Sequence, residues 1–296
     1  MRVTNKMILS TLFNDISKTN TRLFKSYAQL ASGKKVNTPS DDPLAVNGIL
    51  QHKRIISDTE QYQRNIEHAK GYLATSESVM SELTNNLSRL RELAVSQGSG
   101  TANAETRLDI SFEVGELFNQ LVSAGNSKFG DRYLFAGHLS DTPPFDSVGA
   151  YGGDSSESAL QIGPSTTFTY GTTGNKLFKG VGFTGGVDIY QVVDDFKTAL
   201  VGNNTTNIQN AIGNLDSALN QVDKVTAQIG ARINRVDAQK TSLDNFLLEA
   251  TQLLSNAEET DFTSVTTELA LQQTTLEALL ASSSKVNTLN IFNFIR

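Results

Sequence analysis

The most informative stretch for the fold is residues 62–94, YQRNIEHAKGYLATSESVMSELTNNLSRLRELA. Apolar residues recur there at alternating steps of four and three, and only Ser76 is strongly polar: Tyr62, Ile66, Ala69, Leu73, Ser76, Met80, Leu83, Leu87, Leu90 and Ala94. A helix places such positions on one face, so the pattern predicts a single apolar stripe of the kind found in coiled coils. We expect a helix over 44–97, roughly 80 Å long at 1.5 Å per residue.

A second run with the same rhythm covers 208–254, broken only at Thr226 and Lys240. It predicts a helix about as long as the first. A shorter helix is expected over about 104–128. The two ends are also expected to be helical, because apolar residues recur at helical spacing in both. The last helix is expected to begin at Asp261, a good N-cap residue.

The middle of the chain has a different composition. Residues 130–186 hold 12 of the 22 glycines and three of the five prolines. Alternation such as Thr167-Phe168-Thr169-Tyr170 predicts short strands between turns. We therefore expect a hairpin near 130–140 and a small, separable β-rich insertion over 141–186.

Together these patterns predict a mainly α fold: a long, antiparallel, coiled-coil-like helical bundle formed by the N- and C-terminal regions, with a small β-rich inserted domain. The expected parts are terminal axial helices (1–40 and 258–296), a long bundle (41–140 and 187–257) and an outer insertion (141–186). Residues 1–40 hold seven basic residues and one acidic residue, whereas 241–296 hold seven acidic and two basic residues. This asymmetry predicts that the terminal helices pair, with Lys18, Arg22 and Lys25 facing Glu268 and Glu277.

The segment LASGKKVNTPSDDP (30–43) joins the first two predicted helices. Gly33 can adopt the left-handed conformation that ends a helix. Asp42 can cap the next helix, and Pro43 suits its first position. Chemistry alone therefore favours a helix–linker–helix over any ligand site.

Composition and motifs argue against catalysis. The chain has no cysteine, and its three histidines show no metal-ligand spacing. The GVGFTG stretch at 180–185 matches a dinucleotide fingerprint, but no strand–helix–strand pattern surrounds it. Adjacent carboxylates such as Asp41/Asp42 do not face each other on a helix. We expect no enzyme activity, no cofactor and no metal.

Charge and hydropathy limit the partners and the location. The net charge of −6 argues against nucleic-acid binding. No run of 18 apolar residues is present, so no membrane-spanning helix is expected. We expect no cleavable secretory signal at the start, because its apolar run is too short and no small-residue cleavage site follows. Its basic, amphipathic character also fits a mitochondrial transit peptide, a less favoured alternative.

Several motifs resemble those of the bacterial flagellin family. They are the 30–43 linker, RELAVSQ (91–97) with the turn, Arg107 and Glu113 that follow it, QIGARINR (228–235) and VNTLNI (286–291). The resemblance covers about 1–140 and 187–296. Within the family, MRVT (1–4), RYLFAG (132–137) and PPF (143–145) resemble the FlgL-type branch, whose members join hook to filament, more than flagellin itself.

This resemblance implies a structural subunit of the extracellular flagellum, exported through the flagellar type III apparatus without a cleaved signal. It implies self-assembly into a ring, contacts with hook-associated protein 1 and flagellin, and an export chaperone. The alternatives are flagellin itself or, less favoured, a helical type III secretion tip protein.

The stripes supply two groups of candidate site residues. The axial assembly interface is expected at Leu12, Ile16, Leu23, Leu30, Leu269, Leu276, Leu279, Val286, Leu289 and Phe292. The bundle core is expected at Ile66, Leu73, Met80, Leu83, Leu87, Leu90, Leu219, Val222, Ile229, Ile233 and Val236. If the terminal helices pair only with each other, we expect six apolar residues to be partly exposed, two of them also in the expected interface: Leu12, Phe24, Leu271, Leu280, Phe292 and Ile295.

Overall fold

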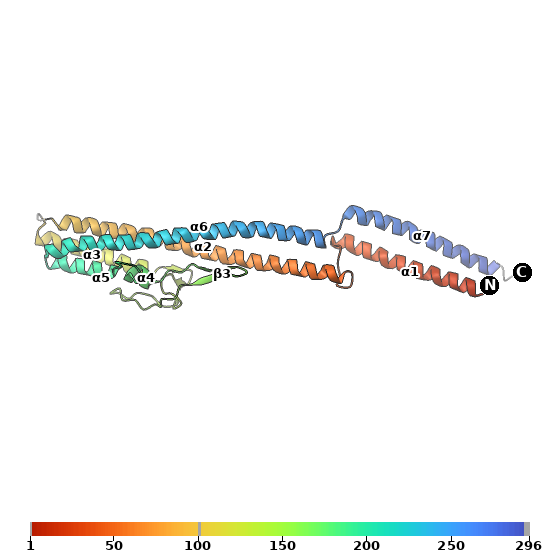
Figure 1. Ribbon diagram of the computed structural model, residues 1–296, viewed down its shortest axis with the longest axis horizontal. Coiled ribbons are helices and arrows are strands. Elements are labelled where there is room, and N and C mark those ends of the chain that lie inside the picture. Colours follow the sequence, from red (N-terminus) through yellow and green to blue (C-terminus); the bar gives the residue numbers. More distant parts are fainter. Residues whose placement is uncertain (1, 100–101, 293–296) are drawn as a thin grey trace. The chain divides into compact units, whose positions relative to one another are not determined.

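The computed structural model describes residues 2–99 and 102–292, with the side chains of 7–99 and 102–285. Long helices dominate it (Figure 1), which confirms the predicted fold class. The helices are α1 (Arg2–Ser32), α2 (Pro43–Gln97), α3 (Ala104–Gly125), α4 (Gly174–Lys179), α5 (Ile189–Val201), α6 (Thr205–Glu258) and α7 (Phe262–Phe292). The strands form two antiparallel pairs: β1 (Lys128–Phe129) with β2 (Arg132–Tyr133), and β3 (Ala159–Gly163) with β4 (Thr166–Thr169).

The chain divides into two compact units, and both long helices contribute to each. The smaller unit contains 1–58 and 245–296, and the larger contains 59–244. The sequence predicts divisions at 40/41 and 257/258, close to the loops. The observed divisions lie inside α2 and α6 because the start of α2 packs with the end of α6: Lys53 Nζ lies 2.9 Å from a carboxylate oxygen of Glu258.

In the larger unit, α2 and α6 run antiparallel in a constant register. Glu67 pairs with Lys240, Lys70 with Asp237 and Arg91 with Asp216. Each step forward along α2 is thus matched by an equal step back along α6. Surface ion pairs of this kind each contribute about 0–1 kcal/mol, so they report the register more than they stabilise it.

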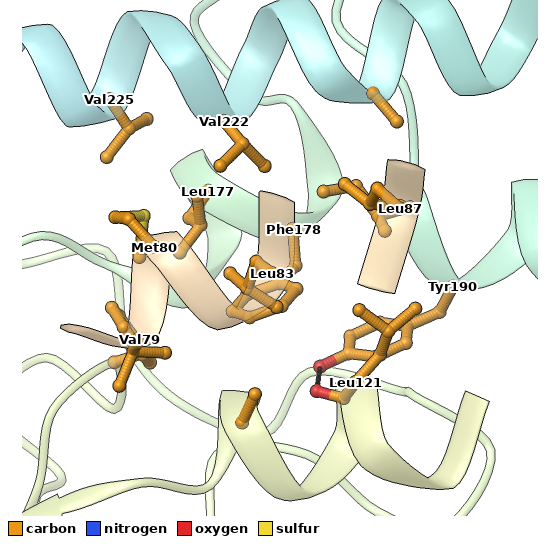
Figure 2. Packing of buried hydrophobic residues seen from close by; sticks show 14 of the residues in the cluster. Val79, Met80, Leu83, Leu87, Leu121, Leu177, Phe178, Tyr190, Val222 and Val225 are labelled. Carbon is orange, nitrogen blue, oxygen red and sulfur yellow. Dashed lines mark hydrogen bonds between the residues drawn. The ribbon is translucent and has the colours of Figure 1, made fainter. Parts of the chain in front are cut away.

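The core of the larger unit lies between the long helices and the shorter elements packed on them (Figure 2). Met80, Leu83 and Leu87 of α2 lie in one cluster with Val222 of α6, and Tyr190 donates a hydrogen bond of 3.1 Å to the carbonyl of Leu121. The expected core residues lie there. Fully buried are Ile66, Leu73, Met80, Leu83, Leu87, Leu90, Val222, Ile229 and Val236, whereas Leu219 and Ile233 are only partly buried.

The glycine-rich segment 141–186 shares this core. Its Phe145, Phe168 and Phe178 are buried in the same cluster as the bundle residues. Arg232 of α6 donates to the carbonyl of Gly171 at 2.8 Å and pairs with Glu157 at 3.2 Å. The insertion that the sequence predicts to be separable thus shares side-chain packing with the bundle, and its separability stays a prediction. Its aromatic residues are not spaced in a helical pattern, so the sequence does not show that they pack on the helices.

Candidate assembly surface on the terminal helices

α1 and α7 lie side by side in the smaller unit (Figure 1) and meet along one seam. Residues that are buried or half-buried recur on both helices at steps of three and four. On α1 they include Leu9, Leu12, Ile16, Thr19, Leu23, Ser26 and Leu30, and on α7 Val265, Leu269, Gln272, Leu276, Leu279 and Ser283. This spacing keeps one face of each helix against the other.

The most buried residues of this seam include polar ones. Ser26 is 3 % exposed and Gln272 is 8 % exposed. The Ser26 hydroxyl donates to the Gln272 side-chain oxygen at 3.3 Å, and the Gln272 amide donates to Glu268 at 2.9 Å. A satisfied polar layer of this kind adds little hydrophobic stabilisation, but it can specify the register of two helices.

Large apolar side chains lie on the outer faces of the same helices. Phe24 is 70 % exposed, Leu271 67 % and Met7 65 %. Of the 20 strongly exposed large apolar residues in the described part of the chain, 13 lie in the smaller unit. That unit has far fewer residues than the larger one. Its exposed apolar surface is therefore concentrated, as expected of an interaction surface.

The expected interface residues thus occupy two different faces. Leu12, Ile16, Leu23, Leu30, Leu269, Leu276 and Leu279 lie in the seam, half-buried or buried within one chain. The side chains of Val286, Leu289 and Phe292 fall outside the described residues, as does Ile295. Phe24, Leu271 and Leu280 are exposed and Leu12 is half-buried, so all four side chains are at least partly exposed.

Sequence reasoning missed four exposed residues of α1: Met7, Ile8, Phe13 and Tyr27. The only signal used in the sequence was the spacing of the seam residues at steps of three and four. These four residues do not follow that spacing, so it did not reveal them. An amphipathic helix with one partner normally carries polar residues at such positions.

The linker that follows α1 is tied to the segment that precedes α7. Gly33 adopts a left-handed conformation (φ 69°), which ends α1 as predicted. The Lys35 amide donates to the Glu258 carbonyl at 2.7 Å, and the Thr260 amide donates to the Gly33 carbonyl at 3.0 Å. The two chain reversals therefore form one hydrogen-bonded elbow.

Two carboxylates anchor this elbow. Glu258 is largely buried and accepts from Lys34 Nζ at 2.7 Å and Lys53 Nζ at 2.9 Å, which lowers its pKa. Asp41 accepts from the Thr38 amide at 2.9 Å, and this contact is the main reason why its pKa falls to about 2. The elbow thus depends on ionised carboxylates.

Capping residues set the helix starts beside the elbow. The Asp42 carboxylate accepts from the Leu44 and Ala45 amides at 3.1 and 3.0 Å, and Pro43 begins α2. The Asp261 carboxylate accepts from the Thr263 amide at 2.9 Å before α7. Both caps confirm the predictions made from the sequence.

Two of the charged residues predicted to pair between α1 and α7 instead contact other partners. Lys25 pairs with Asp41 of the elbow at 3.2 Å, and Glu268 accepts from Gln272 of its own helix. The contacts between α1 and α7 include neutral ones, such as the 2.9 Å hydrogen bond from the Gln273 amide to the Tyr27 hydroxyl.

Within 2–99 and 102–292, no helix has the length and apolarity needed to cross a membrane. Nor does any cluster of His, Asp or Glu in that described part bring together enough ligands for a metal ion.

Family comparisons match both ends of the chain. Residues 3–140 match the bacterial flagellin N-terminal helical region, and residues 212–295 match the bacterial flagellin C-terminal helical region. The chain belongs to the bacterial flagellin family. The match covers α1, α7 and most of both long helices, so this flagellin-family chain carries the family's helical framework.

Two relatives differ in how much of the chain they cover. Flagellar hook-associated protein 3 of Salmonella typhimurium is 25% identical over 317 residues, which span 100% of both chains. Flagellin FlaB1 of Treponema pallidum is 25% identical over 239 residues, which span 77% of this chain and 76% of its own. The likeness to the hook-associated protein therefore extends through the non-helical middle.

Solved structures have a similar fold. A putative flagellar hook-associated protein from Vibrio parahaemolyticus superposes with a TM-score of 0.68 at 19% identity, covering 74% of this chain and 100% of the other. At this level of identity, the likeness concerns the fold alone.

Proposed function

We propose that the chain is a structural subunit that joins hook to filament in the bacterial flagellum. The observation that carries this proposal is the arrangement of the α1/α7 pair. Polar Ser26 and Gln272 are buried in its seam, whereas Phe24 and Leu271 face outward. Packing within one chain leaves this pair incomplete, and further copies would cover the outer face.

The expected energies suit an assembly that needs several simultaneous contacts. Burying one large apolar side chain contributes about 1.5–3 kcal/mol. The eight large apolar side chains that are strongly exposed in the described parts of α1 and α7 would together supply on the order of 10 kcal/mol. Association of two proteins costs roughly 4–15 kcal/mol. A single pairwise contact is thus marginal, whereas a closed ring gives each subunit two neighbours.

The partners follow from this role. The subunit assembles with copies of itself, with hook-associated protein 1 on the cell side and with flagellin on the distal side. An export chaperone covers the apolar C-terminal helix before secretion, which takes place without a cleaved signal peptide. The chain therefore acts outside the cell, and its role is structural rather than catalytic.

Flagellin is the alternative function. The hook-associated relative matches this chain from end to end, including 141–186, whereas the flagellin of Treponema pallidum covers 77% of it and a flagellar filament core protein of Brachyspira hyodysenteriae covers 92%. The middle segment is where members with different positions in the flagellum would differ, because the helical ends share a common framework. The junction role is therefore favoured.

A deletion strain separates the two functions. Electron microscopy of cells lacking the gene should show hooks without filaments, and flagellin should appear in the culture medium. Complementation with the intact gene should restore filaments. Filaments that still grow to normal length would refute the junction role, and loss of filaments without shed flagellin would indicate flagellin itself.

A further inference from the structure

A pocket of about 340 Å³ opens on the larger unit. Its wall is formed by α2, by the β1–β2 hairpin with the loop that follows it, and by residues that flank β3 and β4. Four aromatic rings line it: Tyr72, Phe129, Tyr133 and Tyr170. The volume is at the lower end of the range for small-molecule sites and would hold one ring-sized ligand.

The aromatic wall is already formed. The ring of Tyr72 lies 4.8 Å from that of Tyr170 at an angle of 84°, and 6.0 Å from that of Phe129 at 75°. These edge-to-face contacts favour a single arrangement of the rings. The Tyr72 hydroxyl donates to the Leu134 carbonyl, which further fixes its side chain. A ligand would therefore meet a surface that needs little reorganisation.

The pocket contains one permanent cation, the guanidinium of Arg132. Arg132 lines the pocket together with His68 and His138, and none of the lining residues is acidic. In the part of the chain that the structure describes, the Arg132 guanidinium has no ion-pair partner. Lys128 adds a further cation 4.4 Å from the centre of the Tyr133 ring.

Two carboxylates of the segment before β3 already have partners. Glu157 pairs with Lys176 at 3.1 Å and with Arg232 at 3.2 Å. Asp154 accepts from the His138 amide at 2.9 Å and from the Ser156 amide at 3.0 Å. The guanidinium of Arg132 thus remains available to an anion from solution, in a chain whose net charge is −6.

We propose that this pocket binds a small molecule that carries a carboxylate on a ring. The ring would lie against Tyr72, Tyr170 and their neighbours, and the carboxylate would pair with Arg132. A guanidinium forms two parallel hydrogen bonds to a carboxylate, which fixes the orientation of the bound molecule. Two ligand sources share this chemistry: acidic sugars, whose ring faces stack on aromatic side chains, and simple aromatic acids.

Isothermal titration calorimetry on the full-length chain tests the site. The probes are glucuronate and benzoate, with glucose and benzyl alcohol as their uncharged counterparts. We expect saturable binding of at least one acid, with a Kd on the order of 1 mM, and binding of its neutral counterpart at least about tenfold weaker. Glucuronate alone would identify an acidic sugar site, benzoate alone an aromatic acid site, and binding of both would support the shared chemistry.

Two variants connect binding to the pocket. Arg132→Gln should lower the affinity for the acid at least about tenfold. The melting temperature should not change, because the Arg132 side chain has no structural partner. Arg54→Gln, a matched change at an exposed helical arginine outside the pocket, should bind like the parent protein. The site is disproved if neither acid binds below about 10 mM, if the neutral compounds bind as well as the acids, or if Arg132→Gln and Arg54→Gln bind equally.

Discussion

Two adjacent residues of α1 allow folding and assembly to be separated. Leu23 is 9 % exposed and lies in the seam with α7, whereas Phe24 is 70 % exposed on the outer face. The changes Leu23→Gln and Phe24→Gln introduce the same polar side chain one position apart. Leu23→Gln removes a contact made within one chain, and Phe24→Gln removes a surface that only another molecule can cover.

The expected magnitudes follow from these exposures. Burying a Leu or Phe side chain is worth about 1.5–3 kcal/mol. Leu23→Gln should therefore destabilise the α1/α7 pair by about 2 kcal/mol and weaken assembly only as a consequence. Phe24→Gln should leave the free monomer within about 0.5 kcal/mol of the parent, because an exposed side chain contributes little to folding.

Assembly should respond in the opposite order. Phe24→Gln should reduce the free energy of assembly by about 1–2 kcal/mol for each neighbour that would cover Phe24. This corresponds to a factor of roughly 5–30 in the association constant of each contact. Adding Leu271→Gln, a change at a residue 67 % exposed on α7, should approximately double the loss in free energy.

Two assays measure these effects. Thermal melts followed by far-UV circular dichroism, at concentrations where the protein is monomeric, report the folding term. Filament counts and swimming in a complemented deletion strain report assembly. If Phe24→Gln lowers the melting temperature as much as Leu23→Gln does, or if the Phe24→Gln/Leu271→Gln double variant assembles normally, the outer face of α1/α7 is not the assembly surface.

Further predictions concern the terminal helices, the elbow and the middle segment. In the free monomer, α1 and α7 should be cleaved first in limited proteolysis while 59–244 resists, because the seam between the two helices includes a polar layer. If the amides of α1 and α7 are as protected from hydrogen exchange as those of 59–244, folding and assembly are not coupled. Glu258→Gln should lower the melting temperature at pH 7, since the lowered pKa of Glu258 reflects stabilisation that is present above its unfolded pKa of about 4.3 and is lost as pH falls through the folded value. The gap from the parent should therefore narrow at pH 3, and a gap that is independent of pH would show that the ionised carboxylate does not stabilise the elbow. Replacing 141–186 with a Gly/Ser linker should destabilise 59–244 by several kcal/mol, because Phe145, Phe168 and Phe178 are removed from the shared core. An unchanged melting temperature would show that the insertion is separable.

Local sequence patterns were sufficient to predict the long helices, their approximate ends and the family resemblance. A stripe with steps of three and four requires a helix, because only that geometry places those positions on one face. Gly33, Asp42 and Asp261 marked helix ends because capping depends on a few adjacent residues. The flagellin-like motifs could be recognised for a similar reason, since each is a short stretch read along the chain.

The tertiary structure was needed to show which apolar residues are covered within one chain and which face outward. Leu23 and Phe24 look equally apolar in the sequence, and burial depends on the position of α7, more than 200 residues further along. The same reason explains the middle segment, whose aromatic residues join the bundle core without any periodic signal. It also explains the candidate pocket, which brings Tyr72 of α2 to Tyr170, far along the chain. Local patterns specify the backbone of each element, whereas packing depends on contacts between distant segments, which no local pattern records.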